Sequence, residues 1–334
     1  MNSLERYAAT IAGQPTDFLP RVPILMQFAA EHIGSNYAAF AADYRVLAEA
    51  NLRCRADFGF EQVSCISDSY RETQGFGAEI EYMRDSAPRC LAPPLELSKD
   101  LSSLATPDPL VSERMLDRVN AAREMRARVG DECSVLGWIE GPGAEAADVR
   151  GVMNFLIDTM DDLPFCRELM DRCVEVGIAF AKAQIEAGAD TIGVGDAIAS
   201  QVTPDFYHAE IQPRELRLVQ AIHDKGAWAK LHICGDITQL LPGIAELGLD
   251  MLDVDYMVDL QTVRQAVGKG VTIAGNIDPV AIVHQGTPAG IRLAIERCYE
   301  TVGNPFMVNA GCEIPPGTPV ENFHAFCQPI PYRG

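Results

Sequence analysis

The residues best suited to chemistry in this chain are one histidine and two cysteines. His232 and Cys234 are separated by one residue in the stretch 231–236 (LHICGD), and Cys312 lies in 309–313 (NAGCE). If residues 232–234 form a strand, the side chains at i and i+2 point to the same side, so His232 and Cys234 can face one ion. An imidazole and two thiolates suit Zn²⁺. Three protein ligands leave a fourth position open, as in catalytic zinc sites.

The same residues also fit a site without metal. A His-x-Cys pair on a strand is commonly a buried pair, and free cysteines often serve as small buried hydrophobic residues. The chain has ten cysteines, but no paired Cys-x-x-Cys pattern of a structural zinc site. The residue pattern alone therefore leaves both a catalytic zinc site and a metal-free pair open.

The elements that must position these residues show as short apolar runs that alternate with helical patterns. Near-continuous apolar runs are typical of parallel strands buried on both faces. The helical patterns cover 161–186, 204–226, 240–247 and 288–302, and most of them end at a glycine. The eight expected strands are residues 22–28, 62–67, 134–139, 191–196, 229–234, 251–256, 271–277 and 306–312.

Eight strand–helix units predict an α/β fold of the (β/α)₈ TIM-barrel type. An open doubly wound sheet is the alternative, but the chain has no Gly-x-Gly-x-x-Gly or Walker-type phosphate loop. The Pro-rich stretch 82–94 lies between the second and third expected strands and is expected to pass over the barrel mouth. No linker or repeat is visible, so we expect one domain over residues 1–334.

In such a barrel the catalytic residues lie at the C-terminal ends of the strands. Among the residues at these ends, Asp196, Asn276, Gln27 and Asp68 are candidates for binding substrate, and Tyr70 is added from the loop after the second strand. Each is also compatible with a structural hydrogen-bonding role. The full set at the strand ends is Gln27, Asp68, Glu140, Asp196, His232, Cys234, Asp255, Asn276, Asp278 and Cys312.

Composition excludes several classes of partner. The 27 basic and 47 acidic residues give a net charge of −20, which disfavours nucleic acid and anionic membrane surfaces. No apolar run reaches the length of a transmembrane helix, and the N-terminus lacks the pattern of a secretory signal. We therefore expect a cytoplasmic protein whose cysteines are reduced.

Several motifs resemble the uroporphyrinogen decarboxylase superfamily, and within it the branch of methylcobalamin:thiol methyltransferases, such as those that use coenzyme M. The resemblance spans nearly the whole chain, and the His-x-Cys…Cys set is its most specific part. The matching stretches are 137–142 (GWIEGP), 186–190 (EAGAD), 232–236 (HICGD), 275–279 (GNIDP), 311–315 (GCEIP), 318–319 (TP) and 321–322 (EN).

The resemblance implies a zinc ion held by His232, Cys234 and Cys312, which activates a thiol for methylation. Similarity to cobalamin-independent methionine synthases implies an acidic fourth ligand, for which Asp255 is the best match; a helix-capping or loop role is the alternative. The methyl group would come from methylcobalamin on a separate corrinoid-binding protein, because the chain lacks the Asp-x-His-x-x-Gly signature of cobalamin binding. The thiol would be a small molecule such as coenzyme M or homocysteine.

Other activities of the same superfamily stay open. One is demethylation of a methoxy or methylthio substrate, with the methyl group passed to the corrinoid protein. Another is a metal-free decarboxylase-type lyase, although the Arg-rich stretch that grips carboxylates in the decarboxylases is missing from 26–32 (MQFAAEH). A non-catalytic scaffold is disfavoured because the chain retains His232, Cys234 and Cys312 together. Barrels of this superfamily often dimerise, so a homodimer is one possible assembly.

Overall fold

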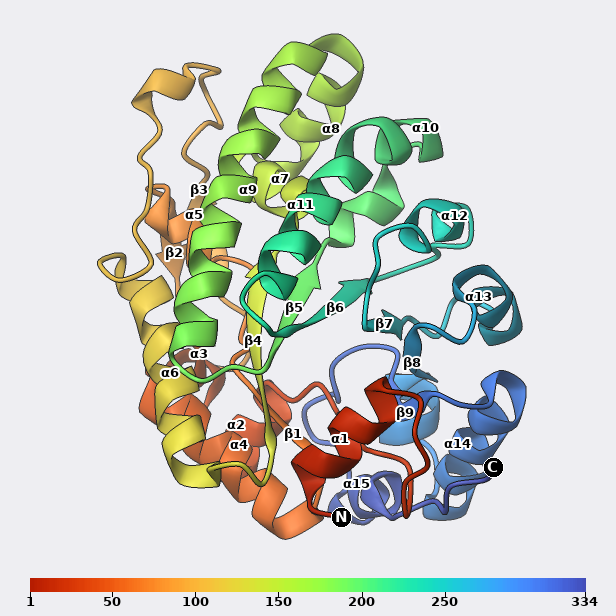
Figure 1. Ribbon diagram of the computed structural model, residues 1–334. Helices are drawn as coiled ribbons and strands as arrows, with labels where there is room; N and C mark the ends of the chain where they lie inside the picture. Colours follow the sequence, from red (N-terminus) through yellow and green to blue (C-terminus); the bar gives the residue numbers. More distant parts are fainter.

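A curved sheet of seven parallel strands forms the centre of the computed structural model, which describes residues 1–334 (Figure 1). Consecutive strands of the sheet are neighbours, in the order β1-β4-β5-β6-β7-β8-β9. Almost every strand residue is buried, as expected for parallel strands with helices outside and side chains inside. The strands are β1 (Gln62–Ser64), β4 (Ser134–Glu140), β5 (Thr191–Gly195), β6 (Trp228–Ile233), β7 (Met251–Val254), β8 (Thr272–Ile277) and β9 (Phe306–Ala310).

The chain before β1 closes the barrel without forming a regular strand. The Val22 N–H donates to the carbonyl of Val308 on β9 at 2.9 Å, and the Glu61 N–H donates to the Arg21 carbonyl at 2.9 Å. This short segment therefore joins β9 to β1 at the eighth position. The (β/α)₈ prediction is confirmed by this arrangement.

The predicted strand at 22–28 is wrong in its extent. Pro20 and Pro23 have no N–H group to donate to a strand ladder, and the chain turns into helix α2 from Gln27. An apolar run (VPILMQF) is thus extended chain for a few residues and then helix. The apolar pattern found the position of this element but not its type.

Helices pack around the outside of the sheet (Figure 1). The expected helix 288–302 is α14, capped by the Thr287 side chain, and the expected helix 161–186 is α9. The helices are α1 (Ser3–Ile11), α2 (Gln27–His32), α3 (Tyr37–Ala42), α4 (Tyr44–Phe58), α5 (Arg71–Gly75), α6 (Glu113–Val129), α7 (Pro142–Arg150), α8 (Val152–Asp161), α9 (Leu163–Glu186), α10 (Pro204–Phe206), α11 (Gln212–His223), α12 (Leu241–Ile244), α13 (Leu260–Val267), α14 (Pro288–Val302) and α15 (Val320–Cys327).

The N-terminal end of the barrel is plugged by α1. Tyr7 is fully buried there, its hydroxyl lies 3.0 Å from Thr191 Oγ1, and it packs with Val22, Met251 and Met307. The opposite end, where the strands point, is left for a functional site.

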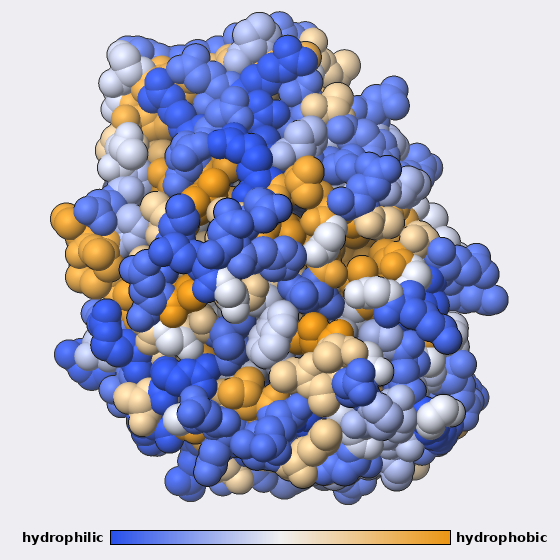
Figure 2. Space-filling view, in the orientation of Figure 1, coloured by the Kyte–Doolittle hydropathy of each residue, from blue (hydrophilic) through white to orange (hydrophobic).

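The long connection after α5 contains a small antiparallel hairpin of β2 (Glu79–Glu81) and β3 (Arg89–Ala92) that the sequence did not predict. The face in Figure 2 is mostly hydrophilic, and its hydrophobic residues form separate patches. None of the helices combines the length and the hydropathy that a membrane crossing requires.

Candidate active site

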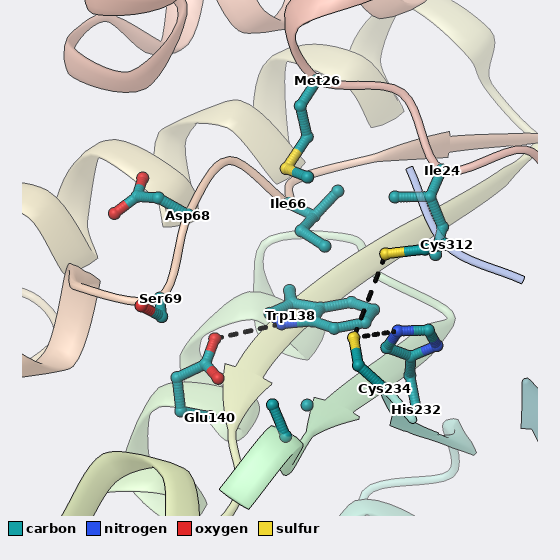
Figure 3. A pocket seen from close by; sticks show the side chains of 12 residues that line it. Ile24, Met26, Ile66, Asp68, Ser69, Trp138, Glu140, His232, Cys234 and Cys312 are labelled. Carbon is teal, nitrogen blue, oxygen red and sulfur yellow. Dashed lines mark hydrogen bonds between the residues drawn. The ribbon is translucent and has the colours of Figure 1, made fainter. Parts of the chain in front are cut away.

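Three potential metal ligands meet at the C-terminal end of the barrel. His232 belongs to β6, Cys234 follows that strand, and Cys312 follows β9 (Figure 3). His232 Nε2 lies 3.1 Å from Cys234 Sγ, and the two sulfur atoms lie 4.0 Å apart. All three ligand atoms are within 4.8 Å of one another.

These distances fit a tetrahedral zinc ion. Zinc–sulfur bonds of about 2.3 Å at tetrahedral angles place two sulfur atoms roughly 3.8 Å apart, and a nitrogen–sulfur pair somewhat closer. The observed separations lie close to both values. The donor set of one nitrogen and two sulfurs is also the chemistry that zinc prefers.

The three ligand side chains perturb one another's protonation. A hydrogen bond with Cys234 and the neighbouring His232 lower the pKa of the Cys312 thiol to about 5, although burial opposes this. The shared hydrogen bond raises the pKa of Cys234 above its ordinary value, and burial adds to this. One thiolate and one thiol therefore share a proton, as expected of close ligands before a cation displaces it.

A buried carboxylate orients the histidine. Asp253 on β7 is paired in register with His232, and its Oδ2 lies 3.3 Å from His232 Nδ1. This contact leaves Nε2 for the sulfur side, the arrangement that metal-bound histidines usually have. Asp253 Oδ2 also lies 3.0 Å from Lys230 Nζ, and Asn309 donates to Oδ1 at 2.7 Å. Burial opposes ionisation of Asp253, but Lys230 and His232 lower its pKa to about 2.

A cavity of about 180 Å³ opens beside the three ligands and is lined by all of them. Trp138 on β4 forms part of its wall and lies across Gly193 and Gly195 of β5. A Cβ at Gly193 would lie 2.3 Å from the indole ring, and a Cβ at Gly195 would lie 2.9 Å from it. The two glycines in 191–195 (TIGVG) therefore make room for the tryptophan.

The far side of the cavity is acidic. Asp68 and Glu140 lie there, on the opposite side of Trp138 from the metal ligands (Figure 3). Glu140 Oε1 accepts hydrogen bonds from Trp138 Nε1 and from Arg71, and Asp68 accepts from Arg114 at 2.6 Å. Burial opposes ionisation of Asp68, but the two arginines lower its pKa to about 2.

The predicted site residues fall into two groups. His232, Cys234, Cys312 and Asp68 line the cavity. Asp255 is nearby but points to the backbone: it accepts hydrogen bonds from the N–H groups of Gly235 at 2.9 Å and Met257 at 3.2 Å. It does not belong to the group of ligand atoms that converge.

The other predicted substrate residues lie outside the cavity lining. Asp196 is fully buried and accepts from the N–H groups of residues 143 and 144 at the start of α7, and burial raises its pKa to about 7. Asn276 donates to the carbonyls of residues 255 and 258 and so holds the loop after β7. Gln27 donates a hydrogen bond to Glu31. Tyr70 is half-buried and directly follows Asp68 and Ser69, which line the cavity.

Sequence reasoning did not single out Trp138, Glu140 or Asp253 as site residues. The barrel rule had already placed Glu140 among the residues at the strand ends, but no role was assigned to it. Trp138 and Asp253 each lie two residues before such an end and share its side of the strand. The side-chain period was therefore the available signal for both.

The fold and the residues at the strand ends together define a class of protein: a (β/α)₈ barrel with one histidine and two cysteines at the C-terminal ends of its strands. The model of the uroporphyrinogen decarboxylase (URO-D) family matches residues 2–330, and the chain belongs to this family. The predicted resemblance is thereby confirmed.

Curated relatives cover nearly the full length. The chain is 29% identical to the methylcobamide:CoM methyltransferase MtbA of Methanosarcina mazei over 95% of this chain and 94% of that protein. It is 25% identical to MtaA of Methanosarcina barkeri, covering 96% and 95%. It is also 25% identical to the uroporphyrinogen decarboxylase of Microcystis aeruginosa, covering 93% and 92%.

Solved structures agree on the fold. A methyltransferase from Methanosarcina mazei superposes with a TM-score of 0.90 at 24% identity, covering 98% of this chain and 97% of that one. A B12-independent methionine synthase from Shewanella sp. W3-18-1 gives a TM-score of 0.59 at 15% identity, with 85% of each chain covered.

Proposed function

We propose that this protein is a zinc-dependent methyltransferase that moves a methyl group between a corrinoid protein and a thiol. The observation that carries the proposal is the convergence of His232, Cys234 and Cys312 on one point that opens into a cavity. Three ligands with an open fourth side are typical of a catalytic zinc site. Two relatives that are named methylcobamide:CoM methyltransferases match this chain over most of their length, and they support the same reaction class.

Bound zinc would supply the positive charge that deprotonates a thiol near neutral pH. The chain's own residues hold the ligands in place: Asp253 fixes the ring orientation of His232, and Lys230 balances the buried carboxylate. Trp138, Ile66 and Ile24 form an apolar wall that limits water around the reacting sulfur. Asp255 is proposed as a fourth ligand only if its side chain leaves the N–H of Gly235.

The reaction balances without any further reagent. A corrinoid that binds here would supply the methyl group and keep both electrons of its carbon–cobalt bond. A sulfur lone pair would form the new carbon–sulfur bond, and the thiol proton would leave to solvent. The corrinoid comes from a separate protein, and coenzyme M and homocysteine are the two proposed thiols. Helix α8 at this end of the barrel exposes Met153, Ile157 and Met160, an apolar stripe that supports protein docking there.

Two other activities are weaker. A methoxy or methylthio demethylase would use the same zinc site in the opposite direction. A metal-free decarboxylase is supported by the decarboxylase relatives, but the residues that line the cavity include no lysine or arginine to bind the eight carboxylates of a tetrapyrrole. The arginines nearest that cavity are also already paired with Asp68 and Glu140.

Metal analysis of the purified, dialysed protein tests the proposal. We expect about one zinc per chain, with loss of the metal in His232→Ala and in Cys312→Ser. Cys90→Ser is the matched control, because Cys90 is a partly exposed cysteine on β3 outside the site. The zinc-loaded protein should then methylate a thiol from methylcobalamin. Zinc that is absent from the wild type, or that both site variants retain, would reject the proposal.

A further inference from the structure

The cavity has two chemically different ends. The sulfur and imidazole ligands lie at one end, and the carboxylates of Asp68 and Glu140 lie at the other (Figure 3). Between them the wall is apolar, formed by Trp138, Ile66 and Met26. A ligand whose sulfur reaches the metal site must therefore extend its other end along an apolar wall toward two acids.

No lysine or arginine lines the acidic end of the cavity, nor any other part of its wall. The two guanidinium groups behind the wall are buried and ion-paired. Arg71 has a side chain 0% exposed and contacts Glu140 and Glu72, and Arg114 is 2% exposed and binds Asp68 at 2.6 Å. A negatively charged ligand group would meet carboxylates and no unpaired positive charge.

One carboxylate oxygen is left for a ligand. Glu140 has a side chain only 8% exposed, and its hydrogen bonds from Trp138 and Arg71 both go to Oε1. Its Oε2 accepts no hydrogen bond within the protein, although the residue lines the cavity. This oxygen is open to the cavity rather than enclosed by protein atoms, so it is where a ligand donor is expected to bind.

We infer that the cavity selects a thiol with a positively charged group, such as a primary ammonium, at the end of a short aliphatic chain, with the ammonium on Glu140. This inference rests on the proposed function and names the class of its thiol. A terminal sulfonate, which coenzyme M carries, is the charge that this end of the cavity disfavours.

The electrostatics behind the wall favour a cation as well. Burial raises the pKa of Glu140 well above its ordinary value, and the negative charges of Glu72 and Asp148 add to the effect, although Arg71 opposes it. Burial likewise raises the pKa of Asp148 to about 7. Glu145 is 2% exposed, and neither of its carboxylate oxygens has a hydrogen-bond partner. Burial and the neighbouring carboxylates thus favour the neutral form of Glu140, and a bound ammonium would favour its ionised form instead.

Three thiols with the same two-carbon chain isolate the charge. They are 2-aminoethanethiol, 2-mercaptoethanol and 2-mercaptoethanesulfonate, with a positive, neutral and negative end. Dissociation constants are measured by calorimetry on the zinc-loaded protein, and methyl transfer from methylcobalamin is followed with each thiol. The variant is Glu140→Gln, and Glu186→Gln is the matched control, since it removes the same charge from an exposed surface pair with Lys225.

We expect 2-aminoethanethiol to bind at least tenfold more tightly than 2-mercaptoethanesulfonate. In Glu140→Gln this preference should fall severalfold, and in Glu186→Gln it should not change. Equal affinities, or a preference for the sulfonate, would overturn the inference even if methyl transfer occurs. If the ammonium preference and its dependence on Glu140 hold but no thiol is methylated, the inference on the cavity stands and the proposed function fails.

Discussion

The buried pair of Lys230 and Asp253 allows a quantitative test of how the barrel interior supports the histidine ligand. Both side chains are 0% exposed, and the two charged atoms are 3.0 Å apart. The substitution Asp253→Asn keeps the shape and leaves the Lys230 ammonium without a carboxylate. Removing one partner of a buried ion pair costs about 3–5 kcal/mol, because the other charge stays buried. We expect a loss of this size in the free energy of unfolding.

Urea denaturation of the metal-free protein at pH 7 measures this loss. The double variant Lys230→Met/Asp253→Asn removes both charges and should be more stable than Asp253→Asn alone. Because Asp253 also orients His232, Asp253→Asn should weaken zinc binding by about 10–100-fold, measured by competition with a chelator. A stability loss below about 1 kcal/mol, or a double variant no more stable than the single one, would refute this reasoning.

Three further changes have defined outcomes. Because Arg114 helps to lower the pKa of Asp68 to about 2, against about 4 in an unfolded chain, this carboxylate contributes about 2 kcal/mol above pH 4 and loses it as the pH falls through 2. The stability difference between wild type and Asp68→Asn should therefore shrink between pH 5 and pH 2 in urea titrations, and a constant difference would contradict it. Gly193→Ala places a Cβ 2.3 Å from the Trp138 ring, so we expect a loss of about 1–3 kcal/mol and a shifted tryptophan fluorescence; an unchanged spectrum would count against it. Phe323→Ala removes a fully buried ring at 4.7 Å from that of Phe28 and should cost about 3–5 kcal/mol without changing the zinc content, which metal analysis checks.

The sequence predicted the barrel because its strands are near-continuous apolar runs, most of which are separated by helical patterns. It missed the type of the first element, where Pro20 and Pro23 prevent a ladder within an apolar run. The period of two placed His232 and Cys234 on one side of a strand, and the structure brings Cys312 to them. For the acidic neighbour the sequence analysis favoured Asp255, but Asp253 lies two residues earlier and on the same side of the chain, so the period of two does not distinguish them.

Register decides between these two carboxylates, and register is a property of the assembled sheet. Asp253 is the residue paired with His232 across β6 and β7, so its carboxylate meets the imidazole. Asp255 lies beyond the end of β7 and meets free backbone N–H groups of the loops instead. Register also explains why the sequence did not reveal Trp138 as a site residue, because the position of its ring depends on two glycines of the neighbouring strand.

The charge arrangement of the cavity also determines which way a ligand can enter. In the proposed zinc form, the open coordination position takes a thiolate, whereas an ammonium group has no lone pair to fill it, and the end at Glu140 favours the ammonium. A ligand with sulfur at one end and a cation at the other therefore has one favourable orientation, because reversing it would leave the coordination position unfilled and place the thiolate beside carboxylates. The apolar wall between the ends adds no polar contact that could compensate. Orientation of the sulfur toward the methyl donor thus follows from charges fixed by β4 and β6 and requires no movement of the barrel.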